Sequence, residues 1–136
     1  MKNILVTGGA GYIGSHIVEL LEKKKSSNIY ILDNLSTGHK KLINKNSKFI
    51  KGDIKNFNLL KKIIKNKSIQ IIIHLAANLN VSEAEKQKNK YYRNNVIGTK
   101  NLLLACKNSN VRNIIFSSSC SVYGSVKGSV NEKKKN

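Results

Sequence analysis

The chain contains no proline and no tryptophan, and it has only two cysteines, Cys106 and Cys120. Two cysteines are too few for a disulfide scaffold or a four-cysteine zinc site. We interpret both as buried thiols, because free cysteine packs as a small hydrophobe. No apolar run approaches the roughly 20 residues of a membrane-spanning helix, and the apolar residues 4–6 lead into glycines instead of a cleavage site. We therefore expect a soluble, cytoplasmic protein without a membrane segment.

Acidic residues are also scarce, and seven of them against 25 basic residues give a formal net charge of +18. Such a charge attracts polyanions. However, all basic residues except Arg93 and Arg112 are lysine, whereas nucleic-acid recognition favours the planar arginine fork. The lysines are scattered over predicted helix faces, and aromatic residues for base stacking make up only 6% of the chain. Lysine, asparagine and isoleucine without proline or tryptophan is the pattern that AT-rich codons produce. We expect no specific nucleic-acid partner.

Short apolar runs alternate with stretches of helical periodicity along the chain. The predicted strands cover residues 3–7, 29–32, 49–50, 69–75 and 113–116, and the predicted helices cover the residues after 12, the region 59–64 and about 82–108. In the first helix Ile13, Ile17, Leu20 and Leu21 recur three or four residues apart, which predicts one apolar face. Strands that alternate with helices indicate a parallel sheet covered on both faces. The sequence predicts an α/β, Rossmann-type doubly wound domain over residues 1–125, followed by a polar tail at 126–136.

A glycine-rich turn follows the first predicted strand. The segment Thr-Gly-Gly-Ala-Gly-Tyr-Ile-Gly at residues 7–14 fits both the Gly-x-x-Gly-x-x-Gly and the Gly-x-Gly-x-x-Gly spacing. Glycine permits the dihedral angles of such a turn, lets a pyrophosphate approach the backbone, and lets the helix pack closely on the strand. The free N–H groups and the positive dipole end of that helix then meet the phosphates. Because the motif follows a strand, opens a helix and precedes Asp33 at the end of the next strand, it predicts a dinucleotide site.

Asp33 also selects the cofactor. A carboxylate accepts hydrogen bonds from both ribose hydroxyls but repels a 2′-phosphate, so NAD is favoured over NADP. Lys40 and Lys41 lie close enough in the sequence to weaken that preference.

Two further polar residues lie at or just after the ends of predicted strands. Asp53 has two interpretations, which stay open here: it accepts a hydrogen bond from the adenine amino group, or it serves as a turn or cap residue for the helix that begins near Asn56. His74 we interpret as a hydrogen-bonded core histidine, because no second histidine or cysteine lies at metal-binding spacing. We therefore expect no metal site.

Taken together, the motifs resemble one family, the extended short-chain dehydrogenase/reductases, and within it the UDP-glucose 4-epimerase group. The matching segments occur in the family's order and cover nearly the whole chain. They are Thr-Gly-Gly-Ala-Gly-Tyr-Ile-Gly-Ser-His at 7–16, Asp-Asn-Leu-Ser-Thr-Gly at 33–38, Gly-Asp-Ile at 52–54, His-Leu-Ala-Ala at 74–77, Tyr-Tyr-Arg-Asn-Asn-Val-Ile-Gly-Thr at 91–99 and Ser-Ser-Ser-Cys-Ser-Val-Tyr-Gly at 117–124.

The resemblance implies a cofactor site made of residues from all of these segments. It places Gly8, Gly11, Tyr12, Ile13 and Gly14 around the pyrophosphate, Asp33, Asn34, Ser36, Thr37 and Gly38 at the adenosine ribose, Asp53 and Ile54 at the adenine, Leu75, Ala76 and Ala77 along the cofactor, and Asn94 nearby. Leu79 departs from the pattern, because epimerases often carry a lysine at this point. One expected contact to the cofactor is therefore in doubt.

For the chemistry, the resemblance implies that Ser119 hydrogen-bonds the 4-hydroxyl of a sugar, and that a Tyr-x-x-x-Lys pair farther along supplies the base. Tyr123 and Lys127 match that spacing. They lie too close to Ser119, however, and Gly124 and Gly128 beside them disfavour a helix. We therefore reject them and expect the true pair beyond Asn136.

The implied activity is the interconversion of UDP-glucose and UDP-galactose through a 4-keto intermediate. By this resemblance the chain is the NAD-binding part of a longer, homodimeric protein whose substrate domain is absent here, and the 136 residues alone are expected to be inactive. Two alternatives remain open at this point. One is a related NAD-dependent nucleotide-sugar dehydratase, and the other is a non-catalytic NAD-binding module.

Overall fold

The structure is a computed structural model that describes residues 1–125 and 128–133. Five strands alternate with helices along the chain, and the two 3-10 turns and the π-helix are labelled η. The elements are β1 (Lys2–Thr7), α1 (Tyr12–Lys23), β2 (Ser27–Asp33), η1 (Lys40–Leu42), β3 (Lys48–Lys51), α2 (Phe57–Asn66), β4 (Ile71–His74), α3 (Val81–Lys86), α4 (Lys88–Tyr91), the π-helix η2 (Tyr92–Gly98), α5 (Thr99–Cys106), β5 (Asn113–Phe116) and η3 (Cys120–Tyr123).

The five strands form one parallel sheet in the order β3-β2-β1-β4-β5. The chain runs outward from β1 to β3, then returns to pair β4 on the other side of β1. This reversal is the topological switch point, where a crevice forms outside the carboxyl ends of the strands. The predicted doubly wound α/β fold is confirmed, and all five predicted strands are present.

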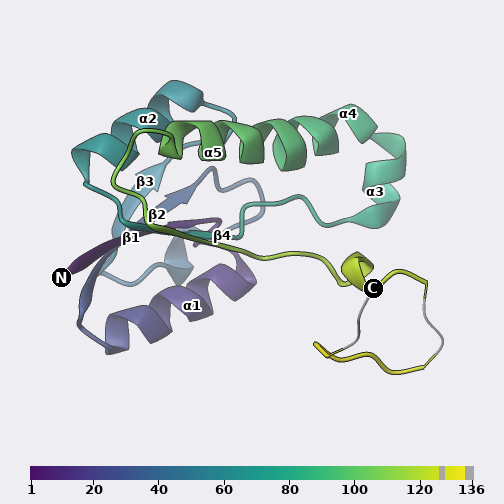
Figure 1. The fold of residues 1–136 in the computed structure, drawn as a ribbon, viewed down its shortest axis with the longest axis horizontal. Helices are drawn as coiled ribbons and strands as arrows, with labels where there is room; N and C mark the ends of the chain where they lie inside the picture. The colour runs from purple at the N-terminus through teal and green to yellow at the C-terminus, as the bar shows by residue number, and fades with distance from the viewer. Residues whose placement is uncertain (126–127, 134–136) are drawn as a thin grey trace.

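Helices cover both faces of the sheet. Figure 1 shows α1 below it and α2, α4 and α5 above it. Because successive side chains of a strand point to opposite faces, β1 divides its residues between two cores: Ile4 and Val6 join the cluster under α1, whereas Leu5 joins the cluster under α2 and α5. The central strands β1, β2 and β4 are therefore buried on both faces of the sheet, as their continuous apolar sequences predict.

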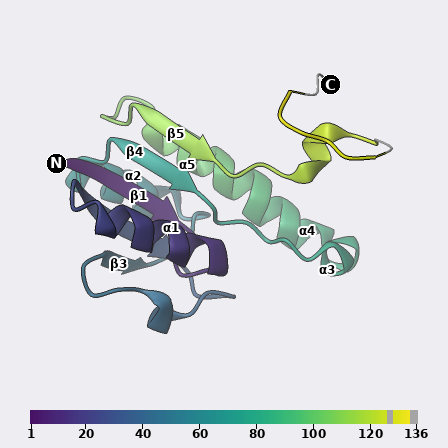
Figure 2. The same cartoon turned by 90° about the horizontal axis from the view of Figure 1, so that it is seen from below.

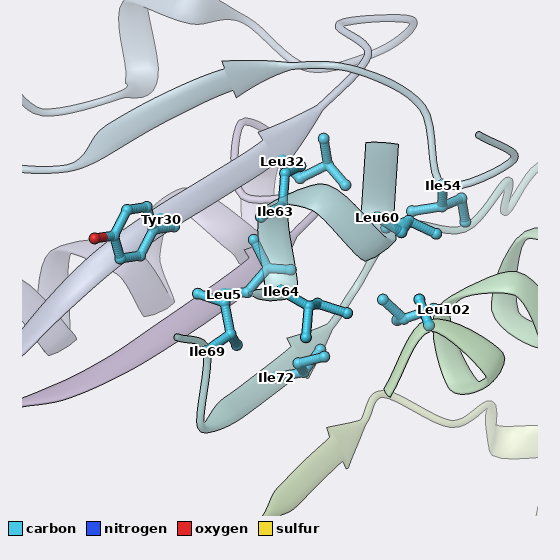
Figure 3. Close-up of a cluster of buried hydrophobic side chains, with 11 residues drawn as sticks. Leu5, Tyr30, Leu32, Ile54, Leu60, Ile63, Ile64, Ile69, Ile72 and Leu102 are labelled. Atoms are coloured by element: carbon cyan, nitrogen blue, oxygen red, sulfur yellow. The ribbon is translucent and has the colours of Figure 1, made fainter. Parts of the chain in front are cut away.

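The larger core lies between the sheet and α2. Figure 3 shows Leu60, Ile63 and Ile64 of α2 pointing toward side chains of the strands, with Leu102 of α5 beside them. In α2 Asn56 accepts a hydrogen bond from the Leu59 N–H at 3.0 Å and so caps the helix. This packing holds α2, and with it the turn at residues 52–56 that precedes the helix, in place against the sheet.

The first helix differs from its predicted face. Gly14 and Val18 are its buried residues, and Ile17 and Leu21 pack beside them, but Ile13 and Leu20 are exposed. Because Gly14 has no side chain, the helix approaches the glycine turn closely at this residue. The face of the helix that contacts the sheet therefore includes Gly14 and excludes Ile13. The prediction that Ile13 and Leu20 belong to the apolar face is wrong.

The long helix predicted over residues 82–108 is interrupted. At Gln87 the backbone leaves the helical region with φ −123° and ψ 48°, which separates α3 from α4. From Tyr92 to Gly98 the helix widens into a π-helix before α5 begins. π-Helical segments are rare in proteins overall, but those that occur are often found at functional sites. Figure 2 shows this helical stretch running alongside β5 toward the end of the sheet where the strands terminate.

The region after β5 packs little against the rest. All four residues of β5 are exposed, and the short turn η3 has no buried residue. The prediction of two buried cysteines is wrong for Cys120, which is exposed at the start of η3, while Cys106 is half-buried in α5. Burial raises the pKa of the Cys106 thiol to about 11. Lys127 and parts of the predicted tail, residues 126–127 and 134–136, lie outside the described residues. Within the described ranges, no helix is long and apolar enough to span a bilayer.

Candidate cofactor site

A cavity of about 660 Å³ opens at the carboxyl edge of the sheet, where the chain reverses between β1 and β4. The segments that line this cavity are far apart in the sequence. Its lining consists of Gly8, Gly11, Tyr12, Ile13, Gly14, Asp33, Asn34, Ser36, Thr37, Gly52, Asp53, Ile54, His74, Leu75, Ala76, Ala77, Asn78, Leu79, Asn94, Asn95, Thr99, Phe116, Ser117, Ser118 and Ser119. Its lining extends from residues that follow β3, at one edge of the sheet, to residues that follow β5, at the other edge.

The glycine turn between β1 and α1 leaves no room for side chains. Gly8 has a φ of +75°, and a Cβ there would lie 2.8 Å from the backbone nitrogen of Ala76. A Cβ on Gly14 would overlap the carbonyl oxygen of Gly8. The Gly8 N–H donates to the Leu32 carbonyl at 2.9 Å, so the turn is fastened to β2. Glycine is needed here both for the left-handed dihedral angle and for the close approach.

The N-terminus of α1 is open to an anion. Gly11 caps the helix without a side chain, and no acidic residue occupies the first turn. The N–H groups of Tyr12, Ile13 and Gly14 precede the first possible intrahelical partner. Together with the positive end of the helix dipole, these groups form a site for a pyrophosphate. The side chain of Tyr12 is 80% exposed at the rim of the cavity.

Asp33 joins two loops of the cavity. It is only 8% exposed, and its Oδ2 accepts a hydrogen bond from the Ala10 N–H at 3.0 Å, while its Oδ1 accepts one from the Leu35 N–H at 2.8 Å. A carboxylate has about four acceptor positions, so two remain for the hydroxyls of a ribose. Leu35 holds a φ of +60° to reach this contact. Such a conformation is strained for a residue with a side chain.

Gly38, predicted to lie at the adenosine ribose, is outside the lining of the cavity. It is buried, and a Cβ there would come within 2.9 Å of the Ala10 backbone. The N–H of the next residue, His39, donates to the Ala10 carbonyl at 2.9 Å. Gly38 therefore lets the 34–38 loop pack against the glycine turn. Lys40 and Lys41 follow in η1, exposed and outside the cavity lining.

Asp53 is held in the turn after β3. Its Oδ1 accepts from the Lys55 N–H at 2.8 Å, and its Oδ2 accepts from Asn34 Nδ2 at 3.0 Å. Partial burial opposes its charge, but the hydrogen bonds from Lys55 and Asn34 and the Lys55 ammonium at 3.3 Å outweigh burial and lower the pKa of Asp53. The cap of α2 is Asn56 and not Asp53. Asp53 does serve as a turn residue, because its carbonyl accepts the Asn56 N–H and its Oδ1 accepts the Lys55 N–H.

His74 lies at the carboxyl end of β4 and is 3% exposed. Its Nδ1 is 2.6 Å from Thr7 Oγ1, and its Nε2 is 2.9 Å from Thr99 Oγ1. Burial lowers the pKa of His74 to about 4, so the ring is neutral at pH 7. The prediction of a hydrogen-bonded core histidine is confirmed. The ring also lines the cavity and links β1 to the start of α5.

The π-helix η2 and the first residue of α5 supply polar residues to the cavity lining. A π-helix repeats its hydrogen bonds after five residues, and Asn94 and Thr99, five residues apart, both line the cavity. Asn95 lines it as well and contacts the backbone of Asn78 in the loop after β4. Leu79, at the position where epimerases often carry lysine, is exposed at the rim.

Ser119 lies at the far end of the cavity, after β5. Its Oγ accepts a hydrogen bond from the Ser121 N–H at 3.0 Å and so caps η3. Tyr123 ends this single turn, and Gly124 follows with a φ of +66°. Tyr123 thus does not lie on an α-helix, which agrees with its rejection as part of a catalytic pair.

The cavity brings together every residue predicted for the site except Gly38. Sequence reasoning assigned no site role to eight further lining residues. They are Gly52, His74, Asn78, Asn95, Thr99, Phe116, Ser117 and Ser118. Five of them end a strand or follow one within two residues at the carboxyl edge, namely Gly52, His74, Phe116, Ser117 and Ser118, and this position is a usable signal. Asn95 and Thr99 depend on the π-helix, for which the sequence gives no comparable signal.

Comparison with known proteins places these features in a family. The model of the NAD dependent epimerase/dehydratase family matches residues 4–136. The chain belongs to this family. The predicted cofactor, NAD, is the cofactor of the family, and the resemblance drawn from the motifs is confirmed.

Individual relatives agree with the family match. The UDP-glucose 4-epimerase of Lactobacillus helveticus is 45% identical over 121 residues, which cover 89% of this chain and 36% of the relative. The dTDP-D-glucose 4,6-dehydratase of Dictyostelium discoideum is 43% identical, covering 92% of this chain and 30% of the relative. The crystal structure of the Brucella ovis UDP-glucose 4-epimerase in complex with NAD superposes with a TM-score of 0.86 at 41% identity, covering 94% and 39%. The chain thus spans about a third of the length of these relatives.

Proposed function

We propose that the chain binds NAD in this cavity and forms the cofactor-binding part of a UDP-glucose 4-epimerase, which interconverts UDP-glucose and UDP-galactose. The observation that carries the proposal is the convergence of the glycine turn, Asp33 and Ser119 on one cavity at the switch point of the sheet. The Lactobacillus helveticus epimerase, at 45% identity, supports the choice of reaction.

The cavity residues fit the parts of NAD in order. The open N-terminus of α1 takes the pyrophosphate, and the remaining acceptor positions of Asp33 take the adenosine ribose hydroxyls. Asn34, Ser36 and Thr37 close over this ribose, while Asp53 and Ile54 form the adenine end. Leu75, Ala76 and Ala77 lie beside the glycine turn, and Asn94 lines the same cavity. Bound NAD would supply a reversible hydride acceptor for carbon 4 of the sugar.

Ser119 is the residue of this chain that we assign to the substrate. Its hydroxyl would hydrogen-bond the sugar's 4-hydroxyl at the nicotinamide end of the cavity. In the full-length protein, which we propose to be a cytoplasmic homodimer, a Tyr-x-x-x-Lys pair beyond Asn136 would remove the proton. A positioned general base contributes roughly 10² to 10⁴ in rate, so the 136 residues alone should bind NAD and show no turnover of UDP-galactose.

Calorimetric titration of the purified 136-residue chain with NAD⁺ and NADP⁺ tests the binding step. NAD⁺ should bind more tightly, and Asp33→Ala should weaken NAD⁺ by about tenfold, the equivalent of about 1.4 kcal/mol, while removing the preference. Asn44→Ala is the matched control, because Asn44 contacts Glu22 outside the cavity. Absence of NAD⁺ binding by the unmodified chain would exclude the proposed function, and so would equal affinity for both cofactors.

A nucleotide-sugar dehydratase is the second candidate, favoured by the 43% identity to the Dictyostelium discoideum dehydratase. The two reactions differ in groups beside the catalytic tyrosine, not in the cofactor cavity. The genomic sequence after the codon for Asn136 separates them: an acidic pair next to a Tyr-x-x-x-Lys motif favours dehydration, and the motif without that pair favours epimerisation. A stop codon together with retained NAD affinity favours the third candidate, a non-catalytic NAD-binding module.

A further inference from the structure

The side chain of Asn95 pairs with a single backbone unit of the loop after β4. Its Oδ1 accepts a hydrogen bond from the Asn78 N–H at 2.9 Å, and its Nδ2 donates to the Asn78 carbonyl at 3.0 Å. A residue of a neighbouring antiparallel strand would make the same pair of hydrogen bonds, one to the N–H and one to the carbonyl of Asn78. The loop has no strand on that side, so a side chain from η2 satisfies its backbone instead.

This pairing fixes the orientation of two carboxamides. A backbone N–H only donates and a carbonyl only accepts, so the oxygen of Asn95 has to face the Asn78 N–H. Asn94 Nδ2 donates to the same Asn95 oxygen at 2.9 Å. Because that oxygen only accepts, Asn94 must offer its NH₂ group to Asn95 and turn its oxygen the other way.

The oxygen of Asn94 accepts no hydrogen bond from any residue within 1–125 or 128–133. Asn94 is nevertheless 8% exposed and lines the cavity, and all other polar atoms of the two asparagine side chains have partners. Within the described chain, the free acceptor of these two side chains is therefore Asn94 Oδ1.

We propose that Asn95 is a positioning residue that acts through Asn94. Anchored on the Asn78 backbone, Asn95 turns the Asn94 carboxamide so that the cavity receives an acceptor oxygen instead of an NH₂ group. The group of the ligand that meets Asn94 is then a donor, such as a ribose hydroxyl or an amide N–H, and not a phosphate oxygen. The inference rests on the proposed function, since NAD is the ligand it serves.

The first test is a double-mutant cycle on NAD⁺ affinity, measured by calorimetry on the 136-residue chain. Asn95→Ala and Asn94→Ala should each weaken binding by about tenfold, and the double variant by little more than either, because each removes the same oriented oxygen. Asn28→Ala is the control: it breaks an Asn28–Asn3 side-chain hydrogen bond outside the cavity and should change affinity by less than about twofold. Losses that simply add would overturn the inference.

A second variant separates orientation from simple support of the loop. Asn94→Asp carries an acceptor on both sides of its carboxylate. With Asn95 present, one oxygen is forced against Asn95 Oδ1, so affinity should fall. In the Asn95→Ala background the same substitution restores an acceptor whichever way the side chain turns, so affinity should rise relative to Asn95→Ala alone. An effect of the same sign in both backgrounds would contradict an orienting role.

A measurement on the unmodified chain covers the case in which variants fail to fold. In ¹⁵N-edited NMR spectra, NAD⁺ should leave the Asn94 Nδ2 protons in their hydrogen-bonded position, because they face Asn95 and not the ligand. Nuclear Overhauser contacts from these protons to NAD would overturn the inference while the proposed function stands. Failure of the unmodified chain to bind NAD⁺ would instead remove the proposed function, and the cofactor role of Asn95 with it.

Discussion

The two ends of the cavity are built in different ways. At the glycine-turn end, Gly8 follows β1 and Asp33 ends β2. Hydrogen bonds join Gly8 to the Leu32 carbonyl and Asp33 to the Ala10 N–H, and Asp33 is buried. At the other end, Ser119 follows β5, a strand at the edge of the sheet whose residues are all exposed. Among the residues that the structure describes, the hydroxyl of Ser119 bonds only to the backbone of its own turn.

This difference shows which contacts hold the residues of each end in place. A group that contacts several buried segments keeps its place because many interactions would have to break together. Ser119 is placed mainly by the direction of β5, whose own contacts are made with β4. The cofactor end of the cavity is therefore self-supporting within this chain, and the end assigned to the substrate is not. The same kind of substitution should consequently have unequal effects at the two ends.

Alanine in place of glycine gives the largest contrast. Gly14→Ala would place a Cβ against the Gly8 carbonyl, and backbone cannot move aside cheaply. We expect the free energy of unfolding to fall by about 3 kcal/mol and NAD⁺ binding to be lost. In Gly124→Ala the Cβ would meet no atom of the described part of the chain within 4 Å, so the positive φ of Gly124 is the unfavourable feature there, at about 1 kcal/mol. Urea unfolding followed by circular dichroism measures both, and equal losses would contradict the comparison.

Much of this architecture was accessible from the sequence. The apolar runs of residues 29–32 and 69–75 marked strands because a parallel strand buried on both faces needs nearly every side chain apolar. The glycine spacing with Asp33 marked the cofactor site because few other residues tolerate such close backbone contacts. Both signals are local, so one sequence is enough to show them.

Other features depend on contacts that local patterns do not contain. The apolar spacing of α1 did not show that Gly14 belongs to the face that contacts the sheet, which leaves Leu20 exposed. The π-helix η2 places Asn94 and Thr99 in the cavity lining, but its wider turn has no counterpart in apolar spacing. Asn95 acquires its role only when the fold brings Asn78 next to it, 17 residues earlier in the chain.

Acid should weaken the cofactor end through His74. The pKa of His74 is lowered by burial to about 4, whereas in the unfolded chain it is about 6.5. Below pH 6.5 the unfolded chain therefore binds a proton that the folded chain does not, and the free energy of unfolding falls until pH 4 is reached. Between pH 6.5 and 5 the loss should be about 2 kcal/mol.

The pH dependence is isolated by comparison with His74→Gln. This variant keeps a polar side chain between Thr7 and Thr99 but does not titrate, so its stability should change less steeply over the same range. Carboxylates such as Asp53 contribute equally to both proteins and cancel in the difference. Urea unfolding at pH 7, 6 and 5 gives the two slopes. Parallel slopes would mean that His74 does not link β1 to α5 in the neutral form.

The smallest effect on stability and on NAD⁺ affinity is expected from a substitution of Ser119, at the other end of the cavity. Ser119→Ala removes the cap of the four-residue turn η3, which is exposed, so the free energy of unfolding should change by less than about 0.5 kcal/mol. NAD⁺ affinity should stay within about twofold, because the pyrophosphate and adenosine contacts lie at the other end. In the full-length protein the same substitution should lower turnover of UDP-galactose by on the order of 10². A stability loss above about 1 kcal/mol would show that η3 has packed support of its own, and the two ends of the cavity would then be alike.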